Sequence, residues 1–208
     1  MPTYKLYYFD VPARGELPRI ILSAAGQPFE DIRFSGQEWP KYKPKMPFGQ
    51  VPVLEVDGQM IAQEYAISKF LARQFGFCSE DNLDHAREDM YVFLSEDIYV
   101  KVEEIFHTRD DKEKSEALKK KFVNETGPVM LSKLEQALSK SASGYLVRGK
   151  LSWADLAVFS NLGVMEFILP TESVNLLEHC PNIRRNMELV RRNPNVNTYL
   201  KQRPSPNA

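Results

Sequence analysis

The chain has 208 residues, a formal net charge of −1 and 43% hydrophobic residues, so it is long and apolar enough to bury a sizeable core. Its 27 Lys and Arg residues against 28 Asp and Glu residues give no excess of positive charge for binding nucleic acid or an anionic membrane. No apolar run approaches the roughly 20 residues needed to cross a bilayer, and the first residues lack the apolar segment of a signal peptide. We therefore expect a cytoplasmic protein.

The two cysteines, Cys78 and Cys180, lie far apart, and neither has a second cysteine nearby. This spacing predicts no disulfide framework, no zinc site and no Cys-x-x-Cys redox pair.

The first 34 residues predict a strand, a helix and a second strand. Residues 4–9 are rich in aromatic side chains and are typical of a strand. Residues 14–25 carry apolar side chains at helical spacing and are followed by Gly26, a residue that commonly ends helices. Residues 29–34 form the second strand. Short connections between these elements imply a parallel strand pair joined by a right-handed crossover.

Residues 35–50 contain three prolines and predict a loop with at most one helical turn, at about 39–43. Loops of this length in compact domains are usually functional.

The stretch 47–67 predicts a strand, a tight turn, a second strand and the start of a helix that ends at Gly76. Pro52 stands at the first strand position and donates no hydrogen bond, so the backbone of Val51 is left available to an extended, peptide-like ligand. The unpaired N–H groups at the start of the helix suit a carboxylate on that ligand. An ordinary hairpin with a proline at its entrance fits the same residues equally well.

Strand signals largely stop after the break at residues 79–82. One long helix is expected over about 84–107 and another over 112–138, with a kink at Gly127-Pro128 where proline interrupts the backbone hydrogen bonds. The sequence thus predicts an α/β domain at residues 1–78 followed by an all-helical domain at 79–208.

Residues 151–156 predict the start of a further helix. Ser152 and Asp155 occupy the two positions of a capping box, and Leu151 can pack on Leu156 as a hydrophobic staple. The apolar residues that follow favour a helix at the buried centre of the second domain.

Several separate motifs in this order resemble the cytosolic glutathione transferases, and the sigma class most of all. They are residues 1–9 (Met-Pro-Thr-Tyr-Lys-Leu-Tyr-Tyr-Phe), Glu38-Trp39-Pro40, Lys43-Pro44, residues 47–58 and residues 201–204. The resemblance implies a thioredoxin-like first domain of the order β-α-β-α-β-β-α that binds glutathione, with Pro52 in the cis form. It also implies a helical domain lining an electrophile pocket, and a homodimer.

The same resemblance implies the roles of individual residues. Tyr8 matches the catalytic tyrosine and Arg14 the arginine beside the thiolate. A hydroxyl that donates to sulfur makes chemical sense, because a free thiol of pKa about 8.5 is mostly protonated at pH 7 and the thiolate is the nucleophile. From the sequence alone, Tyr8 fits equally well as a core aromatic of its strand.

Further positions match contacts to glutathione. These are Trp39 and Lys43 at its glycine end, Gln50, Val51, Pro52, Gln63 and Glu64 along the tripeptide, and Asp97 reaching across the dimer to its amino group. Trp39 is also compatible with a plug of the core. The electrophile pocket is expected at Phe9, Val11, Ala13, Tyr99, Ile105 and Tyr199. No metal is expected, because position 93, an acid in the prostaglandin synthases, is Phe93.

Glu64 departs from the family pattern, which has Ser or Thr after Gln63. A carboxylate there suits the helix dipole but repels the γ-glutamyl carboxylate of glutathione.

The resemblance therefore implies an enzyme that activates the glutathione thiol and conjugates it to hydrophobic electrophiles in detoxification. It leaves open a peroxidase or prostaglandin isomerase activity. The alternative is a binding or structural protein, like the lens members of the class, in which Glu64 has weakened catalysis.

Overall fold

The computed structural model describes residues 2–204 and divides them into two compact units. Unit 1 contains residues 2–78 together with 191–204, and unit 2 contains residues 79–190. The domain boundary predicted from the sequence also follows residue 78. The last described segment groups with unit 1, where the sequence predicts it in the second domain.

Unit 1 is built on a four-stranded mixed sheet of the order β2-β1-β3-β4. The strands are β1 (Tyr4–Phe9), β2 (Glu30–Phe34), β3 (Val53–Val56) and β4 (Gln59–Ala62). β1 pairs parallel with β2 and antiparallel with β3, which pairs antiparallel with β4. Buried and half-buried side chains alternate along β1, as expected for a strand covered on one face.

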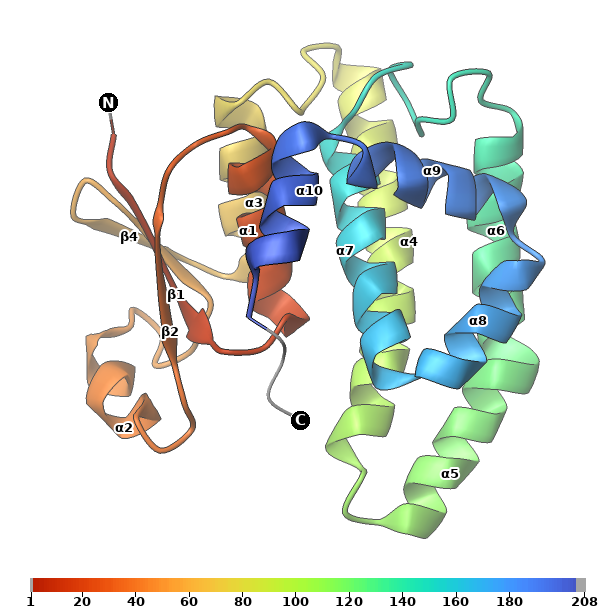
Figure 1. Ribbon diagram of the computed structural model, residues 1–208, viewed down its shortest axis with the longest axis horizontal. Helices are drawn as coiled ribbons and strands as arrows, with labels where there is room; N and C mark the ends of the chain where they lie inside the picture. Colours follow the sequence, from red (N-terminus) through yellow and green to blue (C-terminus); the bar gives the residue numbers. More distant parts are fainter. Residues whose placement is uncertain (1, 205–208) are drawn as a thin grey trace. The chain divides into compact units, whose positions relative to one another are not determined.

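The helices of unit 1 cover the sheet. α1 (Ala13–Ala24) is the crossover between β1 and β2, and it lies beside α3 (Glu64–Gln74) on one face of the sheet (Figure 1). α2 (Trp39–Tyr42) and the short η1 turn (Lys43–Lys45) occupy the loop between β2 and β3. The order β-α-β-α-β-β-α is therefore confirmed. The last helix of the described residues, α10 (Pro194–Gln202), packs on α1, which explains why residues 191–204 group with unit 1.

The loop and turn residues behave as the sequence predicts. Asp57 and Gly58 both have positive φ, at 48° and 83°, as a two-residue hairpin turn between β3 and β4 requires. Gly76 has a φ of 76° directly after α3, in the left-handed conformation that ends many helices. The peptide bond between Val51 and Pro52 is cis, as the resemblance implied.

Every secondary-structure element among the described residues of unit 2 is a helix. Their elements are α4 (Asn82–His107), α5 (Lys112–Lys121), the π-turn η2 (Phe122–Thr126), α6 (Gly127–Ser139), α7 (Trp153–Ile168), α8 (Pro170–Glu178) and α9 (Pro181–Arg191), the last of which ends at the first residue of the returning segment. The interruption predicted at Gly127-Pro128 is the π-turn just before it. Gly127 fits there because an added Cβ would stand 2.8 Å from the carbonyl oxygen of Phe122.

α7 is the buried centre of unit 2. Its first turn forms the predicted capping box, in which the Ser152 amide and hydroxyl both donate to Asp155, at 2.9 and 2.6 Å. Asp155 also accepts from the side chain of Asn186 at 2.7 Å, so the cap ties α9 to α7. Along residues 2–204, no helix is both long and apolar enough to span a bilayer.

Candidate functional site

Tyr8 lies one residue before the end of β1, against the first turn of α1. Its side chain is 7% exposed. A Cβ added to Gly15 would stand 2.3 Å from the Tyr8 ring, so only glycine lets α1 approach the tyrosine this closely. The contact fixes the ring between β1 and α1.

The Tyr8 hydroxyl points to the start of α1. The backbone amide of Arg14 donates to the Tyr8 oxygen at 3.2 Å, so the hydroxyl proton can be donated elsewhere. Burial raises the pKa of Tyr8 to about 12, against the opposing effect of the Arg14 amide. The Tyr8 hydroxyl is therefore protonated at physiological pH and able to donate a hydrogen bond.

A pocket of about 470 Å³ opens in unit 1, within the size range of small-ligand sites. It is lined by Phe9, Arg14, Trp39, Gly49, Gln50, Val51, Pro52, Ala62, Gln63, Glu64 and Tyr65. The structure thus brings together seven of the predicted glutathione contacts from α1, α2 and the stretch around the hairpin, together with Phe9 of β1, a predicted electrophile contact. Tyr8 and Lys43 are not among the lining residues. Gly49, Ala62 and Tyr65 also line the pocket, although no pattern in the sequence predicts this.

The first turn of α3 brings a carboxylate to this pocket. Gln63, the residue before the helix, has a φ of 75° and a ψ of 120°, an uncommon and costly conformation for a residue with a side chain. Glu64 follows as the first helical residue and is 5% exposed. Its Oε2 lies 3.2 Å from Nη1 of Arg14, the arginine predicted to lie beside the thiolate. Glu64, the residue that departs from the family pattern, therefore forms an ion pair with Arg14.

Aromatic packing holds the α2 loop against the sheet. Trp39 meets Phe9 edge to face at 5.6 Å between ring centroids and stacks on Phe34 at 5.8 Å. Trp39 thus packs on the sheet, as a plug of the core would, and it also lines the pocket in which it is a predicted glutathione contact. Lys43 is exposed in η1, beside Gly49.

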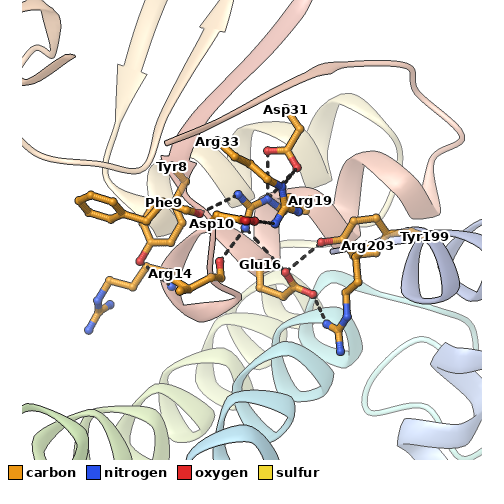
Figure 2. Close-up of polar contacts among 11 residues, drawn as sticks. Tyr8, Phe9, Asp10, Arg14, Glu16, Arg19, Asp31, Arg33, Tyr199 and Arg203 are labelled. Atoms are coloured by element: carbon orange, nitrogen blue, oxygen red, sulfur yellow. Dashed lines mark hydrogen bonds and ion pairs between the residues drawn. The ribbon is translucent and has the colours of Figure 1, made fainter. Parts of the chain in front are cut away.

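A buried charge network supports the loop that follows Tyr8 (Figure 2). Arg19 of α1 is 0% exposed and donates to the carbonyl oxygens of Phe9 and Val11, at 3.2 and 2.9 Å. Its Nε also donates to both carboxylate oxygens of Asp31, each at 3.1 Å. The Arg19 guanidinium lies 5.6 Å from the centroid of the Tyr8 ring. Sequence reasoning missed this network, because charged residues on an amphipathic helix ordinarily face solvent.

The same network extends to Tyr199 of α10 and to Arg203. Glu16, 3% exposed, accepts a hydrogen bond from the Tyr199 hydroxyl at 2.9 Å and forms an ion pair with Arg203 (Figure 2). Burial, followed by the charge of Glu16, raises the pKa of Tyr199. Tyr199 is expected in the electrophile pocket, and its hydroxyl connects α10 to α1 through the hydrogen bond with Glu16.

The other predicted site residues have the following surroundings. Val11 and Ala13 are half-buried beside the start of α1, and Ala13 has a φ of 25°. Tyr99 and Ile105 lie on the buried face of α4 in unit 2, and the Tyr99 hydroxyl donates to Glu103 at 3.2 Å. Asp97, also on α4, is exposed. Phe93 is 54% exposed and offers no ligand atom to a metal.

Two family models match the chain. The model described as "Glutathione S-transferase, N-terminal domain" matches residues 3–73, and "Glutathione S-transferase, C-terminal domain" matches residues 96–203.

Individual proteins match it over nearly their whole length. A glutathione S-transferase of Anopheles gambiae is 39% identical over 207 residues, which cover 98% of each chain. Glutathione S-transferase 1 of Ascaris suum is 36% identical over 208 residues, again covering 98% of each. Among solved structures, prostaglandin synthase D of Nilaparvata lugens has a TM-score of 0.88 at 31% identity, covering 98% of this chain and all of that one. The sigma class transferase of Fasciola hepatica has a TM-score of 0.87 at 29% identity and covers 98% of both chains.

Proposed function

Because the chain belongs to the glutathione S-transferase family and is a glutathione transferase, we propose that the unit 1 pocket binds glutathione and that Tyr8 stabilises its thiolate for transfer to hydrophobic electrophiles. The observation that carries this proposal is the placement of a neutral tyrosine hydroxyl whose oxygen already accepts from the Arg14 amide at the start of α1. Because the Tyr8 oxygen already accepts one hydrogen bond, its proton can be donated to the glutathione sulfur.

The chemistry follows from the thiol. A cysteine thiol of pKa about 8.5 is mostly protonated at pH 7, while only the thiolate is a strong nucleophile. A hydrogen bond from Tyr8 favours the thiolate, and the Arg14 amide polarises the phenol and strengthens that bond. The thiol proton passes to solvent, and the thiolate sulfur forms a bond to the electrophilic carbon of the second substrate. For an aryl halide, the bond from that carbon to the halogen breaks, and the halide leaves with the bonding electron pair.

The pocket offers contacts along an extended peptide. Val51 presents its backbone next to cis-Pro52, and Gln50 and Gln63 add side-chain amides at the rim. Trp39 and the exposed cation of Lys43 lie on the α2 and η1 side, where we place the glycine carboxylate. No metal takes part in this proposal.

We place the electrophile on the Phe9 side of the pocket. The turn with Val11 and Ala13 directly follows the strand that carries Tyr8. Tyr99, Ile105 and Tyr199 stay predicted electrophile contacts. Membership of the sigma class is supported by the motifs in the sequence and by the likeness to the Fasciola hepatica transferase.

A homodimer in the cytoplasm is part of the same proposal, with Asp97 of the partner subunit at the glutathione amino group. Asp97 is exposed on its own subunit, so its carboxylate is accessible to a second copy. Cys78 and Cys180 are both buried, and no disulfide joins them.

Two variants of neighbouring tyrosines test the proposal. Tyr8→Phe should keep glutathione affinity in calorimetry but lower kcat/KM for conjugation of a chromogenic aryl halide by about a hundredfold, as removal of one preorganised donor does elsewhere. Tyr7→Phe is the matched control, because Tyr7 lies on the same strand and donates to Glu55 at 2.9 Å instead. Unchanged turnover in Tyr8→Phe would remove Tyr8 from the reaction.

A second candidate function is favoured by one observation, the buried Glu64 paired with Arg14. The pair withdraws the charge of Arg14 from the sulfur site, which would suit a binding protein with little catalysis. A prostaglandin isomerase, suggested by the name of the Nilaparvata lugens relative, differs in the electrophile alone. Calorimetry with glutathione and assays of the wild-type protein with aryl halides and a prostaglandin endoperoxide separate the three.

A further inference from the structure

The segment that carries Trp39 and Lys43 depends on side-chain contacts to stay in place. α2 is four residues long and η1 is three, and neither contains a buried residue. Helices this short are not stable alone, because they form too few hydrogen bonds to offset the ordering of the backbone. Met46, directly after η1, is 5% exposed and anchors the far end of the segment. The helical turn itself needs another attachment to the sheet.

Two aromatic rings of α2 supply this attachment through Phe34, the last residue of β2, which is 2% exposed. Tyr42 stacks on Phe34 with 4.4 Å between ring centroids and 16° between ring planes. Trp39 lies nearly parallel to the same ring, at 5.8 Å and 9°. Because Trp39 and Tyr42 are three positions apart, both project from one face of the helical turn. Phe34 thus holds α2 through two stacked rings.

Tyr42 belongs to this attachment and not to the pocket lining. Trp39 lines the unit 1 pocket, whereas Tyr42 does not. Lys43 directly follows Tyr42, and a Cβ added to the lining residue Gly49 would stand 3.7 Å from Cε of Lys43. A shift of the turn therefore moves both Trp39 and Lys43 relative to the pocket. The Tyr42 ring can act on a ligand in the pocket through these two residues.

We propose that Tyr42, stacked on Phe34, is a positioning residue that holds Trp39 and Lys43 where they meet the glycine end of glutathione. The inference rests on the proposed function, in which the glycine carboxylate lies on the α2 and η1 side of the pocket. Without the ring, α2 is attached in only a fraction of the molecules, and the apparent affinity for a ligand that needs the attached form falls by that fraction. The stack thereby sets the preference for the tripeptide over γ-glutamylcysteine, which lacks the glycine.

Two ligands that differ only in the glycine test this inference. S-methylglutathione and S-methyl-γ-glutamylcysteine, which cannot form disulfides, are titrated by calorimetry into the wild-type protein, Tyr42→Ala and Tyr42→Phe. Tyr42→Phe keeps the stacked ring and should behave as the wild-type protein does. Phe75→Leu is the control for the loss of an aromatic contact elsewhere in unit 1, because Phe75 meets Tyr4 at 5.9 Å between ring centroids and does not line the pocket.

Tyr42→Ala should bind S-methylglutathione about tenfold more weakly, the order of effect expected for the loss of an aromatic stack, with its affinity for S-methyl-γ-glutamylcysteine unchanged. In conjugation assays, KM for glutathione should rise by a similar factor while kcat stays the same, because Tyr8 keeps its place. The amides of Lys41 and Lys43 should exchange faster with solvent in the ligand-free variant.

Equal losses of affinity for the two ligands in Tyr42→Ala would overturn the inference and leave the proposed function standing, since the ring would then act on the whole domain. Unchanged affinity of Tyr42→Ala for S-methylglutathione would do the same, as would a tenfold loss in Tyr42→Phe or Phe75→Leu. Absence of binding of either ligand to the wild-type protein would overturn both.

Discussion

The immediate surroundings of Tyr8 combine opposing charges. The Arg14 amide and the guanidinium groups of Arg14 and Arg19 favour the phenolate, whereas burial and the carboxylate of Glu64 favour the neutral phenol. Burial is the largest of these influences, so the neutral form prevails. A donor of this kind gives its proton to a hydrogen bond with sulfur without losing it, which is what thiolate stabilisation requires.

The raised pKa of Tyr8 predicts an alkaline loss of stability. An unfolded tyrosine ionises near pH 10 and the folded Tyr8 near pH 12. Below pH 10 both states hold the proton and Tyr8 adds no pH dependence. Above pH 10 the unfolded chain ionises first, so stability falls until the pH passes about 12, by roughly 2 to 3 kcal/mol in total.

This loss is measured by urea unfolding at pH values from 9 to 11.5 for the wild-type protein and Tyr8→Phe. The phenylalanine variant should show a shallower decline over this range, and its ultraviolet titration should lack one phenolate of midpoint near pH 12. Tyr7→Phe provides a comparison for the size of the decline, because the pKa of Tyr7 is also raised to about 12 but its side chain is less buried than that of Tyr8. Parallel declines in the wild-type protein and Tyr8→Phe would show that Tyr8 ionises as in the unfolded chain.

Among the elements, α1 differs most from the sequence prediction, because two of its charged residues are buried. Its apolar positions correctly place it against the sheet, but Glu16 and Arg19 on the same helix are buried as well. Helical periodicity assigns charged residues to solvent, and their partners on β2 and α10 are distant in sequence, so no local pattern marks them. The capping box at Ser152 and Asp155 and the hairpin turn at residues 57–58 were predictable, because each depends on residues within one short segment.

The residues that line the unit 1 pocket were predictable for a different reason. Composition and periodicity alone left Tyr8 as a core aromatic and Pro52 as an ordinary strand start, and only the matched order of motifs gave them roles. The ion pair between Arg14 and Glu64 joins residues that are 50 positions apart, and no local sequence pattern predicts that they pair. Its geometry could be found only in the structure.

The network on α1 predicts that Arg19 positions the loop after Tyr8. Arg19→Met removes a buried cation that fastens the carbonyl groups of Phe9 and Val11 and pairs with Asp31, so it should cost about 3 kcal/mol or more in urea unfolding. Hydrogen exchange of the amides of Asp10, Val11 and Ala13 should also accelerate, because this loop loses its contacts with Arg19.

A surface cation on the same sheet is the control for this experiment. Lys5 lies 3.9 Å from Glu30 and 3.5 Å from Glu55 with its side chain 39% exposed, and Lys5→Met should cost under about 1 kcal/mol. Equal costs for the two variants would mean that the Arg19 contacts add nothing beyond those of an exposed pair. Arg19→Lys separates charge from shape, because lysine cannot reach Asp31 and two carbonyl groups at once.

At the scale of the whole molecule, the proposed homodimer can be tested through the surfaces that a second copy of the chain would contact. Unit 1 leaves Phe48 66% exposed in the loop before β3, and an aromatic side chain this exposed is typical of a binding surface. Unit 2 has a pocket of about 560 Å³ whose lining includes Met90, Tyr91 and Leu94 of α4. An apolar side chain on one unit and a partly apolar pocket on the other are complementary features that a second copy of the chain can use.

Mixed dimers test whether Asp97 acts across the interface. If each site combines Tyr8 of one subunit with Asp97 of the partner subunit, a dimer of Tyr8→Phe with Asp97→Asn contains one intact site and one site with both defects. Its activity should then be about half that of the wild-type dimer, well above the mean of the two parent variants. Differently tagged chains purified in two affinity steps supply this species, and conjugation rates at limiting glutathione measure it.

Phe48→Ser connects this result to the interface. Sedimentation should show a shift from dimer to monomer for Phe48→Ser, together with a loss of glutathione affinity equal to that of Asp97→Asn, because a monomer lacks the partner's carboxylate. Val174→Ser is the matched control, since Val174 on α8 is 67% exposed and should change neither property. A mixed dimer with only the mean activity of its parents would place Asp97 at the site of its own subunit. A monomeric wild-type protein with full glutathione affinity would remove the partner from the site altogether.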